Sequence, residues 1–447
     1  MKLRLIALAS CIGLAALAAG PAQSAVKGAW VATWSASAHG PYPSGNATAG
    51  PDLRFALPDP QAGATDQTFR LMVRPGLWGR AVRLRFTNAF GTRPLAIDDV
   101  FVGLQATGGR VATGTNRAAT FGGRGGITIA PGERAWSDTV ALDGFDPRRL
   151  EVFQGRRLAV SFHVAGASGP ITWHAKALTT SYLSAPNAGS RGSEDGDSAF
   201  PYSSASWFFL DAVDVLAPVG TRVIAAFGDS ITDGTATTMN GDDRWPDALA
   251  ARLKDAGARQ WVVVNQGIGG NRVAGPSSYS AASPVAGGPS AVQRLDRDVL
   301  SLSGLAAIVW LEGINDVARD DTSADMVIAG IREVVRRARE RGVKIFGATI
   351  TSSLGSASGS YGTPDVDRKR RLVNDFIRAS GIFDAVFDFD AATVDPRTGE
   401  LRAEFQPDST SGGPGDRLHP NRAGQMAMAA AIDLAVFTRA ASASRAR

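Results

Sequence analysis

The chain has 447 residues, of which 44 % are hydrophobic and 20 % charged, a balance that is ordinary for globular domains and excludes a wholly disordered chain. Its net charge is +5, but Lys2 and Arg4 at the start and Arg439, Arg445 and Arg447 at the end account for all of it. The rest of the chain is therefore neutral, which argues against a nucleic-acid-binding protein.

Residues 1–25 have the pattern of a secretory signal peptide, with a basic tip, an apolar run and a small-residue stretch. We expect cleavage near Ser24 or Ala25; an alternative is lipoprotein processing at Cys11. Cys11 is the only cysteine, so a chain without this leader has no disulfide, no catalytic thiolate and no zinc–cysteine site. No later apolar run approaches the roughly 20 residues of a membrane span. We therefore expect a protein secreted or released into the periplasm, without a stable membrane anchor.

Short apolar and alternating segments, broken by Gly, Pro, Asn and Asp, predict an antiparallel, jelly-roll-like β-sandwich domain over residues 26–217. Examples are TFRLMVR (68–74) and RLAVSFHV (157–164). The Trp and Tyr residues of this region are either core residues or a platform for a sugar. Residues 184–206 are rich in Gly, Ser and Asp, which predicts a long exposed loop.

Strand-like and helix-like segments alternate from residue 221 onward, which predicts a parallel sheet with helices on both faces in a domain spanning 218–438. Residues 439–447 are expected to form a disordered tail. In such sheets, ligands bind at the carboxyl ends of the strands. The expected strands are 222–227, 261–265, 305–313, 343–350 and 385–390, and the expected helices are 244–257, 324–342, 367–380 and 422–437.

The segment FGDSITDG (227–234) places Ser230 at the carboxyl end of the first of these strands. A serine becomes a good nucleophile only when a base takes its proton, and His419 is the one histidine of this half of the chain. Asp416 lies three residues ahead of His419, where its carboxylate can accept the Nδ1–H of the imidazole. Taken singly, the first segment is also compatible with a plain turn, and His419 with a helix cap or a surface residue.

Two further segments supply hydrogen-bond donors for a developing oxyanion. NQGIGGNR (265–272) follows the second strand and offers backbone N–H groups, and EGINDV (312–317) follows the third and offers the Asn315 amide. The alternatives are an ordinary Gly-rich turn, an ordinary Asn-Asp turn, or a phosphate loop, although the first segment lacks the Lys-Ser/Thr of a nucleotide site. Together with Ser230, the segments predict a serine hydrolase.

GDS (228–230), GIGGNR (267–272), GIND (313–316) and DRLH (416–419) have the order and rough spacing of the four blocks of the GDSL, or SGNH, hydrolases. The resemblance covers about residues 218–437, and the chain looks like secreted bacterial members with an extra N-terminal β domain. It differs in having Ile231 where the family name has Leu, a volume-conserving change. The resemblance implies a flavodoxin-like three-layer α/β/α fold, the catalytic residues Ser230, Asp416 and His419, and an oxyanion hole made by the N–H groups of Ser230 and Gly270 and the side chain of Asn315.

The resemblance also implies hydrolysis of carboxylic esters through an acyl-enzyme, with no metal or organic cofactor. Asp229, Asp233 and Asp316 suggest a cation, but they lack the spacing of a catalytic metal site. Residues 273–291, directly after Gly270, are small and carry no large apolar lid, which favours acetyl or other short acyl groups on a carbohydrate or similar alcohol. The expected partner is thus a small-molecule or polysaccharide ester. The alternatives are a broad-specificity lipase or arylesterase and a glycan-binding protein with an inactive hydrolase domain.

Overall fold

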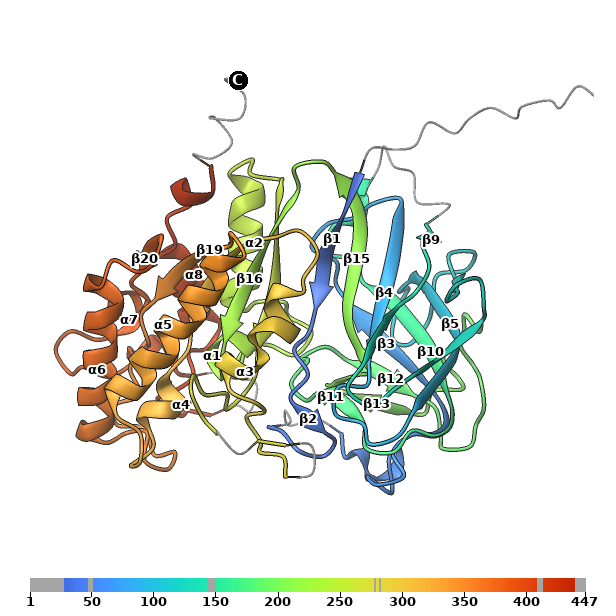
Figure 1. The fold of residues 1–447 in the computed structure, drawn as a ribbon, viewed down its shortest axis with the longest axis horizontal. Helices are drawn as coiled ribbons and strands as arrows, with labels where there is room; N and C mark the ends of the chain where they lie inside the picture. The colour runs from blue at the N-terminus through green and yellow to red at the C-terminus, as the bar shows by residue number, and fades with distance from the viewer. Residues whose placement is uncertain are drawn as a thin grey trace, which may run out of the picture.

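The protein is described from a computed structural model that covers residues 28–46, 51–142, 150–276, 279–280, 283–407 and 413–438. An antiparallel β-rich half and a mixed α/β half lie side by side (Figure 1). The predicted signal peptide, with Cys11, and the predicted tail at 439–447 lie outside the described residues. Within those residues, no helix has both the length and the apolar character needed to cross a bilayer.

The β-rich half confirms the predicted antiparallel architecture, with two larger sheets and one small one. Phe86 on the first large sheet packs edge-on against Phe162 on the second, with ring centroids 5.1 Å apart, so the core lies between the two sheets. The first sheet has the order β1 (Gly28–Ser35), β15 (Leu210–Pro218), β4 (Ala81–Thr87), β8 (Arg134–Trp136), with β9 (Val140–Ala141) on β4. The second has the order β13 (Tyr202–Ser204), β12 (Ser181–Leu183), β3 (Thr65–Val73), β10 (Leu158–Ala167), β5 (Leu95–Leu104), β6 (Arg117–Ala119), with β7 (Gly126–Ile129) on β5. The small sheet has the order β14 (Trp207–Phe208), β11 (Thr172–His174), β2 (Gly40–Pro41), and 3-10 turns cover Leu53–Phe55 and Leu150–Phe153.

Residues 184–206 differ from the predicted exposed loop, because they include β13 and are bound by a buried side chain of β3. The guanidinium of Arg70, on β3, is fully buried and donates to the carbonyl oxygens of Gly196 (2.8 Å) and Glu194 (2.5 Å) in this segment. The same guanidinium stacks over the ring of Phe200 at 4.2 Å. The Gly/Ser/Asp composition correctly indicated irregular backbone, but that backbone is organised around a buried cation supplied by the neighbouring strand.

The α/β half has a five-stranded parallel sheet, which confirms the predicted fold class. Numbered within this half, its strands have the order 2-1-3-4-5 of a flavodoxin-like sheet. Its strands are β17 (Trp261–Gly267), β16 (Arg222–Gly228), β18 (Leu305–Leu311), β19 (Lys344–Ala348) and β20 (Ala385–Phe387). Its helices are α1 (Ser230–Asp233), α2 (Trp245–Asp255), α3 (Ala291–Arg294), α4 (Ile314–Val317), α5 (Ala324–Glu340), α6 (Pro364–Ala379), α7 (Phe389–Thr393) and α8 (Arg422–Ala430), with a π-helical turn at Leu295–Leu300 and a 3-10 turn at Ala403–Phe405.

The final helix is shorter than the predicted 422–437. It ends at Ala430, where Arg252 on α2 donates to the carbonyl oxygens of Ala429 and Ile432 and so satisfies the end of the helix. The side chain of Asp433 then accepts the N–H of Ala435 and starts a separate turn. The apolar periodicity continues across this break, which explains why the sequence pattern missed it.

Candidate active site

Ser230 lies on a sharp turn between β16 and α1. β16 ends at Gly228, and Asp229 caps the short helix by accepting the N–H of Ile231 at 3.0 Å. Gly234 closes α1 in the left-handed conformation, with φ of 105°. Ser230 is the first residue of this helix and is 6 % exposed. The turn thus places its hydroxyl at the carboxyl end of β16, the first strand of this half, as the sequence predicted.

The structure brings Ser230, His419 and Asp416 together although 189 residues separate the first two along the chain. The Oγ–H of Ser230 is 2.8 Å from Nε2 of His419, and Nδ1 of His419 is 2.6 Å from Oδ2 of Asp416. Since the carboxylate can only accept, Nδ1 carries the proton and Nε2 offers its lone pair to the serine. This tautomer is the one in which the imidazole can act as a base toward Ser230.

The carboxylate of Asp416 is held in its ionised form by local donors. Its Oδ1 accepts the backbone N–H groups of Leu418 (2.9 Å) and His419 (2.8 Å). Partial burial alone would raise the pKa of Asp416, but these bonds and the adjacent imidazole lower it well below its usual value. Arg417, at φ of 58°, bends the backbone so that Asp416 and His419 face each other.

The amide of Asn315, at the start of α4, has a fixed orientation. Its Nδ2 donates to the carbonyl oxygen of Asn271 at 2.8 Å, and its Oδ1 accepts the hydroxyl of Tyr361 at 2.7 Å. An amide rotated by half a turn would place two oxygens against each other, so the assignment is unambiguous. One Nδ2 hydrogen therefore remains available for a further acceptor. Tyr361 lies far along the chain from Asn315, and nothing in the sequence indicated this contact.

Gly270 has a left-handed φ of 81°, a conformation that favours glycine, and a Cβ at this position would approach Nδ2 of Asn46 to 2.7 Å. The N–H groups of Gly270 and Ser230 have no hydrogen-bond partner within the part of the chain that the structure describes. Asn46 belongs to the β-rich half and donates to the carbonyl oxygen of the neighbouring Gly269 at 3.2 Å. The glycine turn is thus held in part by the other half of the molecule.

Three acidic side chains, Asp229, Glu312 and Asp316, lie buried beside these turns, and Glu312 is 3.8 Å from the guanidinium of Arg294. Burial raises the pKa of Asp229 to about 7 and that of Asp316 to about 6, and it also raises the pKa of Glu312. Asp316 accepts the N–H of Val273 at 2.7 Å, which ties the segment after the glycine turn to α4. Among the described ranges, no group of three or more His, Asp or Glu side chains has the arrangement of a metal site.

The β-rich half also reaches the site through the end of β11 and the residues that follow it. Nε2 of His174 is 3.1 Å from Oδ1 of Asp233, on α1. Two residues later, the buried ammonium of Lys176 donates to the hydroxyl of Thr235. Asp233 was noticed in the sequence only as a possible cation ligand, and His174 and Lys176 were not identified as site residues. Such cross-half contacts leave no local pattern in a sequence.

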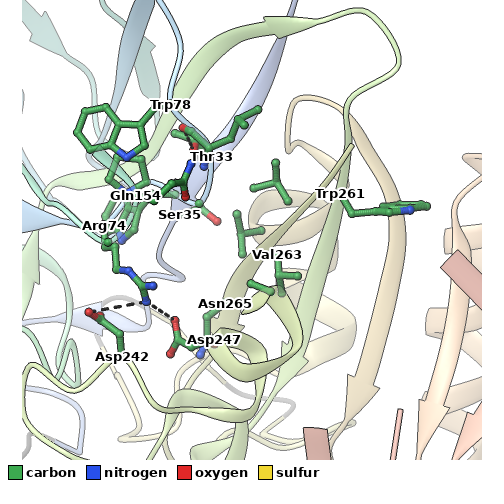
Figure 2. Close-up of a pocket in the computed structure, with 18 of the residues that line it drawn as sticks. Thr33, Ser35, Arg74, Trp78, Gln154, Asp242, Asp247, Trp261, Val263 and Asn265 are labelled. Carbon is green, nitrogen blue, oxygen red and sulfur yellow. Dashed lines mark hydrogen bonds and ion pairs between the residues drawn. The ribbon is translucent and has the colours of Figure 1, made fainter. Parts of the chain in front are cut away.

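A cavity of about 860 Å³ lies between the β-rich half and strand β17, the edge of the parallel sheet. Figure 2 shows Arg74 in this cavity, paired with Asp242 (3.7 Å) and Asp247 (3.6 Å). Ser230 and His419 are not among the lining residues, so the cavity is distinct from the serine–histidine pair. His174 and Asp233 are among its lining residues.

Comparison with known proteins identifies the α/β half. Residues 226–427 match the model of the GDSL-like lipase/acylhydrolase family. Similar solved structures include a carbohydrate acetylesterase family member from Sinorhizobium meliloti (18 % identity, 49 % of this chain and 98 % of that chain, TM-score 0.37). A second is a GDSL-like lipase from Bacteroides thetaiotaomicron (19 % identity, 49 % of this chain and 89 % of that chain, TM-score 0.36). A third is a lipase/acylhydrolase from Enterococcus faecalis (20 % identity, 49 % of this chain and 96 % of that chain, TM-score 0.36). No curated protein matches the chain.

Proposed function

Because residues 226–427 form a GDSL-like lipase/acylhydrolase domain, we propose that the protein is a serine esterase that uses Ser230, His419 and Asp416. The observation that carries this proposal is the continuous relay from Ser230 Oγ to His419 Nε2 (2.8 Å) and from His419 Nδ1 to Asp416 (2.6 Å). It supplies a nucleophile, a base in the right tautomer and an ionised group to stabilise the imidazolium.

In the proposed reaction, Ser230 Oγ attacks the ester carbonyl carbon while Nε2 of His419 takes its proton. The carbonyl oxygen becomes an oxyanion, which accepts hydrogen bonds from the N–H groups of Ser230 and Gly270 and from Nδ2 of Asn315. The imidazolium then gives its proton to the departing alkoxide, which leaves as the alcohol and breaks the ester C–O bond. Water attacks the acyl-serine by the same route, releases the carboxylic acid and restores Ser230.

The preferred substrates under this proposal carry a short acyl group, such as acetyl, on a carbohydrate or similar alcohol. The side chains near the glycine turn are polar: the Lys176 ammonium would lie 3.3 Å from a Cβ at Gly269, and the Asn46 amide faces Gly270. Residues 273–291 add small side chains and no large apolar lid. These features suit a polar ester better than a long aliphatic chain. The leader-like residues 1–25 support export of the enzyme.

The test is hydrolysis of p-nitrophenyl esters from acetate to laurate by the wild type, Ser230→Ala and Ser283→Ala. Ser283 is an exposed serine of the segment that follows the glycine turn and serves as the matched control. We expect rates to peak at acetate, to vanish in Ser230→Ala and to persist in Ser283→Ala. Equal rates in the wild type and Ser230→Ala would refute the mechanism, whereas a peak at long chains would reassign the enzyme as a lipase.

A further inference from the structure

His174 is a buried histidine whose two ring nitrogens both face oxygens that can only accept hydrogen bonds. It is 5 % exposed. Nδ1 lies 2.7 Å from the carbonyl oxygen of Ser37, and Nε2 lies 3.1 Å from the carbonyl oxygen of Lys176 and 3.1 Å from Oδ1 of Asp233. A neutral imidazole would direct a lone pair at one of these oxygens. The partners therefore call for a donor at both nitrogens, and these contacts hold the ring in one orientation.

The charges around His174 fit this arrangement. Burial alone would raise the pKa of Asp233, but His174, Lys176 and Arg244 lower it below its usual value, so a carboxylate faces the ring of His174. The ring of His39 stacks on His174 with centroids 6.0 Å apart. Burial, and then the positive charge of His174, lower the pKa of His39 to about 3, so that ring is neutral. The buried pair thus joins the ring of His174 to a carboxylate, with Lys176 and Arg244 beside it.

Asp233 links this pair to the glycine turn. While its Oδ1 faces His174, its Oδ2 accepts the backbone N–H of Gly269 at 2.9 Å. Gly269 directly precedes Gly270, so the position of Asp233 sets where the N–H of Gly270 points. Asp233 is only 2 % exposed, so losing His174 as its partner is costly.

We propose that His174 of the β-rich half is a positioning residue that, through Asp233, holds the Gly269–Gly270 turn in the geometry that binds the oxyanion. This inference rests on the proposed esterase function. The β-rich half then takes part in the reaction indirectly, because it fixes a donor of the α/β half. A displaced donor weakens the interaction with the transition state more than the binding of the ester itself.

The kinetic test compares His174→Gln with His163→Gln. His163 is a matched control, because its ring nitrogens also face two carboxylates, Asp98 (2.7 Å) and Asp66 (2.9 Å), all within the β-rich half. With p-nitrophenyl acetate, we expect His174→Gln to lower kcat about 10- to 100-fold with KM within about twofold, as for a displaced rather than a deleted donor. His163→Gln should keep the wild-type kcat. An unchanged kcat in folded His174→Gln, with Ser230→Ala inactive, overturns this inference and leaves the esterase proposal standing.

A spectroscopic test does not depend on turnover. It follows the exchange of the Gly269 amide with solvent, because this N–H is held by Asp233. We expect this amide to exchange faster in His174→Gln than in the wild type and in His163→Gln. An unchanged exchange rate at Gly269 overturns the inference whatever the esterase assays show. If His174→Gln does not fold, Asp233→Asn tests the same link, since it should lower kcat.

Discussion

Replacement of Asn315 is the sharpest test of the proposed oxyanion hole. One hydrogen of Nδ2 is bound to the carbonyl oxygen of Asn271 (2.8 Å) and Oδ1 is bound by Tyr361 (2.7 Å), so the second hydrogen has a fixed direction before the ester binds. Asn315→Ala removes this donor. Loss of one such donor lowers kcat about 100- to 1,000-fold, or about 3–4 kcal/mol of transition-state stabilisation. KM should change little, because the donor acts mainly in the transition state.

Tyr361→Phe is a milder variant that tests the orientation of the same amide as Asn315→Ala. It removes only the hydroxyl that holds Oδ1, while the bond from Nδ2 to Asn271 still prevents the amide from rotating. One neutral hydrogen bond is worth about 1 kcal/mol, which corresponds to a fall in kcat of about fivefold. The structure therefore predicts a ranking of wild type, Tyr361→Phe and Asn315→Ala in order of decreasing kcat.

The assay is steady-state hydrolysis of p-nitrophenyl acetate, with urea unfolding of each variant to establish that it is folded. Asn315 is only 6 % exposed, so its removal leaves the Tyr361 hydroxyl and the Asn271 carbonyl short of a partner and lowers the free energy of unfolding by about 1–3 kcal/mol. A folded Asn315→Ala variant that retains more than about a tenth of the wild-type kcat would refute the assignment of Asn315 as an oxyanion donor. An equal fall in kcat in Tyr361→Phe and Asn315→Ala would refute the predicted ranking.

Two further predictions concern stability. Arg70→Met should lower the free energy of unfolding, measured in urea, by about 3–5 kcal/mol, because it removes the buried cation from the carbonyl oxygens of Gly196 and Glu194. If the free energy of unfolding falls no more than in Arg54→Ala, at an exposed arginine, Arg70 does not anchor residues 184–206. Burial raises the pKa of Asp229 from 3.8 to about 7, so between these pH values the folded protein holds a proton that the unfolded chain has lost. The free energy of unfolding therefore falls by about 1.4 kcal/mol per pH unit between about pH 4 and 7 because of this group. Asp229→Asn should lack this contribution, and identical pH slopes for the two proteins would show that Asp229 is ionised throughout.

The α/β half was largely predictable because the residues within each strand and helix indicate its type. Apolar runs such as 222–227 and 305–311 are buried on both sides, as parallel strands are, and the segments after them carry the polar residues. Because the carboxyl ends of parallel strands share one edge, the sequence could place Ser230 and Asn315 at that edge without knowing the strand order. His419 was predicted by elimination, since it is the one histidine of this half.

The contacts between the two halves were not predictable in the same way. Asn46, His174 and Lys176 lie 223, 59 and 59 residues from the positions that they contact, and no spacing rule connects them. Tyr361 escaped prediction for the same reason. Its hydroxyl faces Asn315 only because α4 and the segment after β19 meet at the same sheet edge. A composition pattern reports what kind of backbone a segment forms, as in residues 184–206, but not which distant side chain organises it.

The polar character of the boundary between the halves explains how they maintain one alignment. The buried guanidinium of Arg294 donates to the hydroxyl of Ser37, in the β-rich half, at 3.1 Å. It also donates at 2.8 Å to the carbonyl oxygen of Gly228, two residues before Ser230. An apolar boundary would tolerate small displacements at little cost, whereas a shift here would leave buried charges without partners. The glycine turn is therefore constrained from both sides, by the Asn271–Asn315 bond within the α/β half and by Asp233 and its partner His174 across the boundary. A donor that must meet an oxyanion within a few tenths of an ångström benefits from such double constraint.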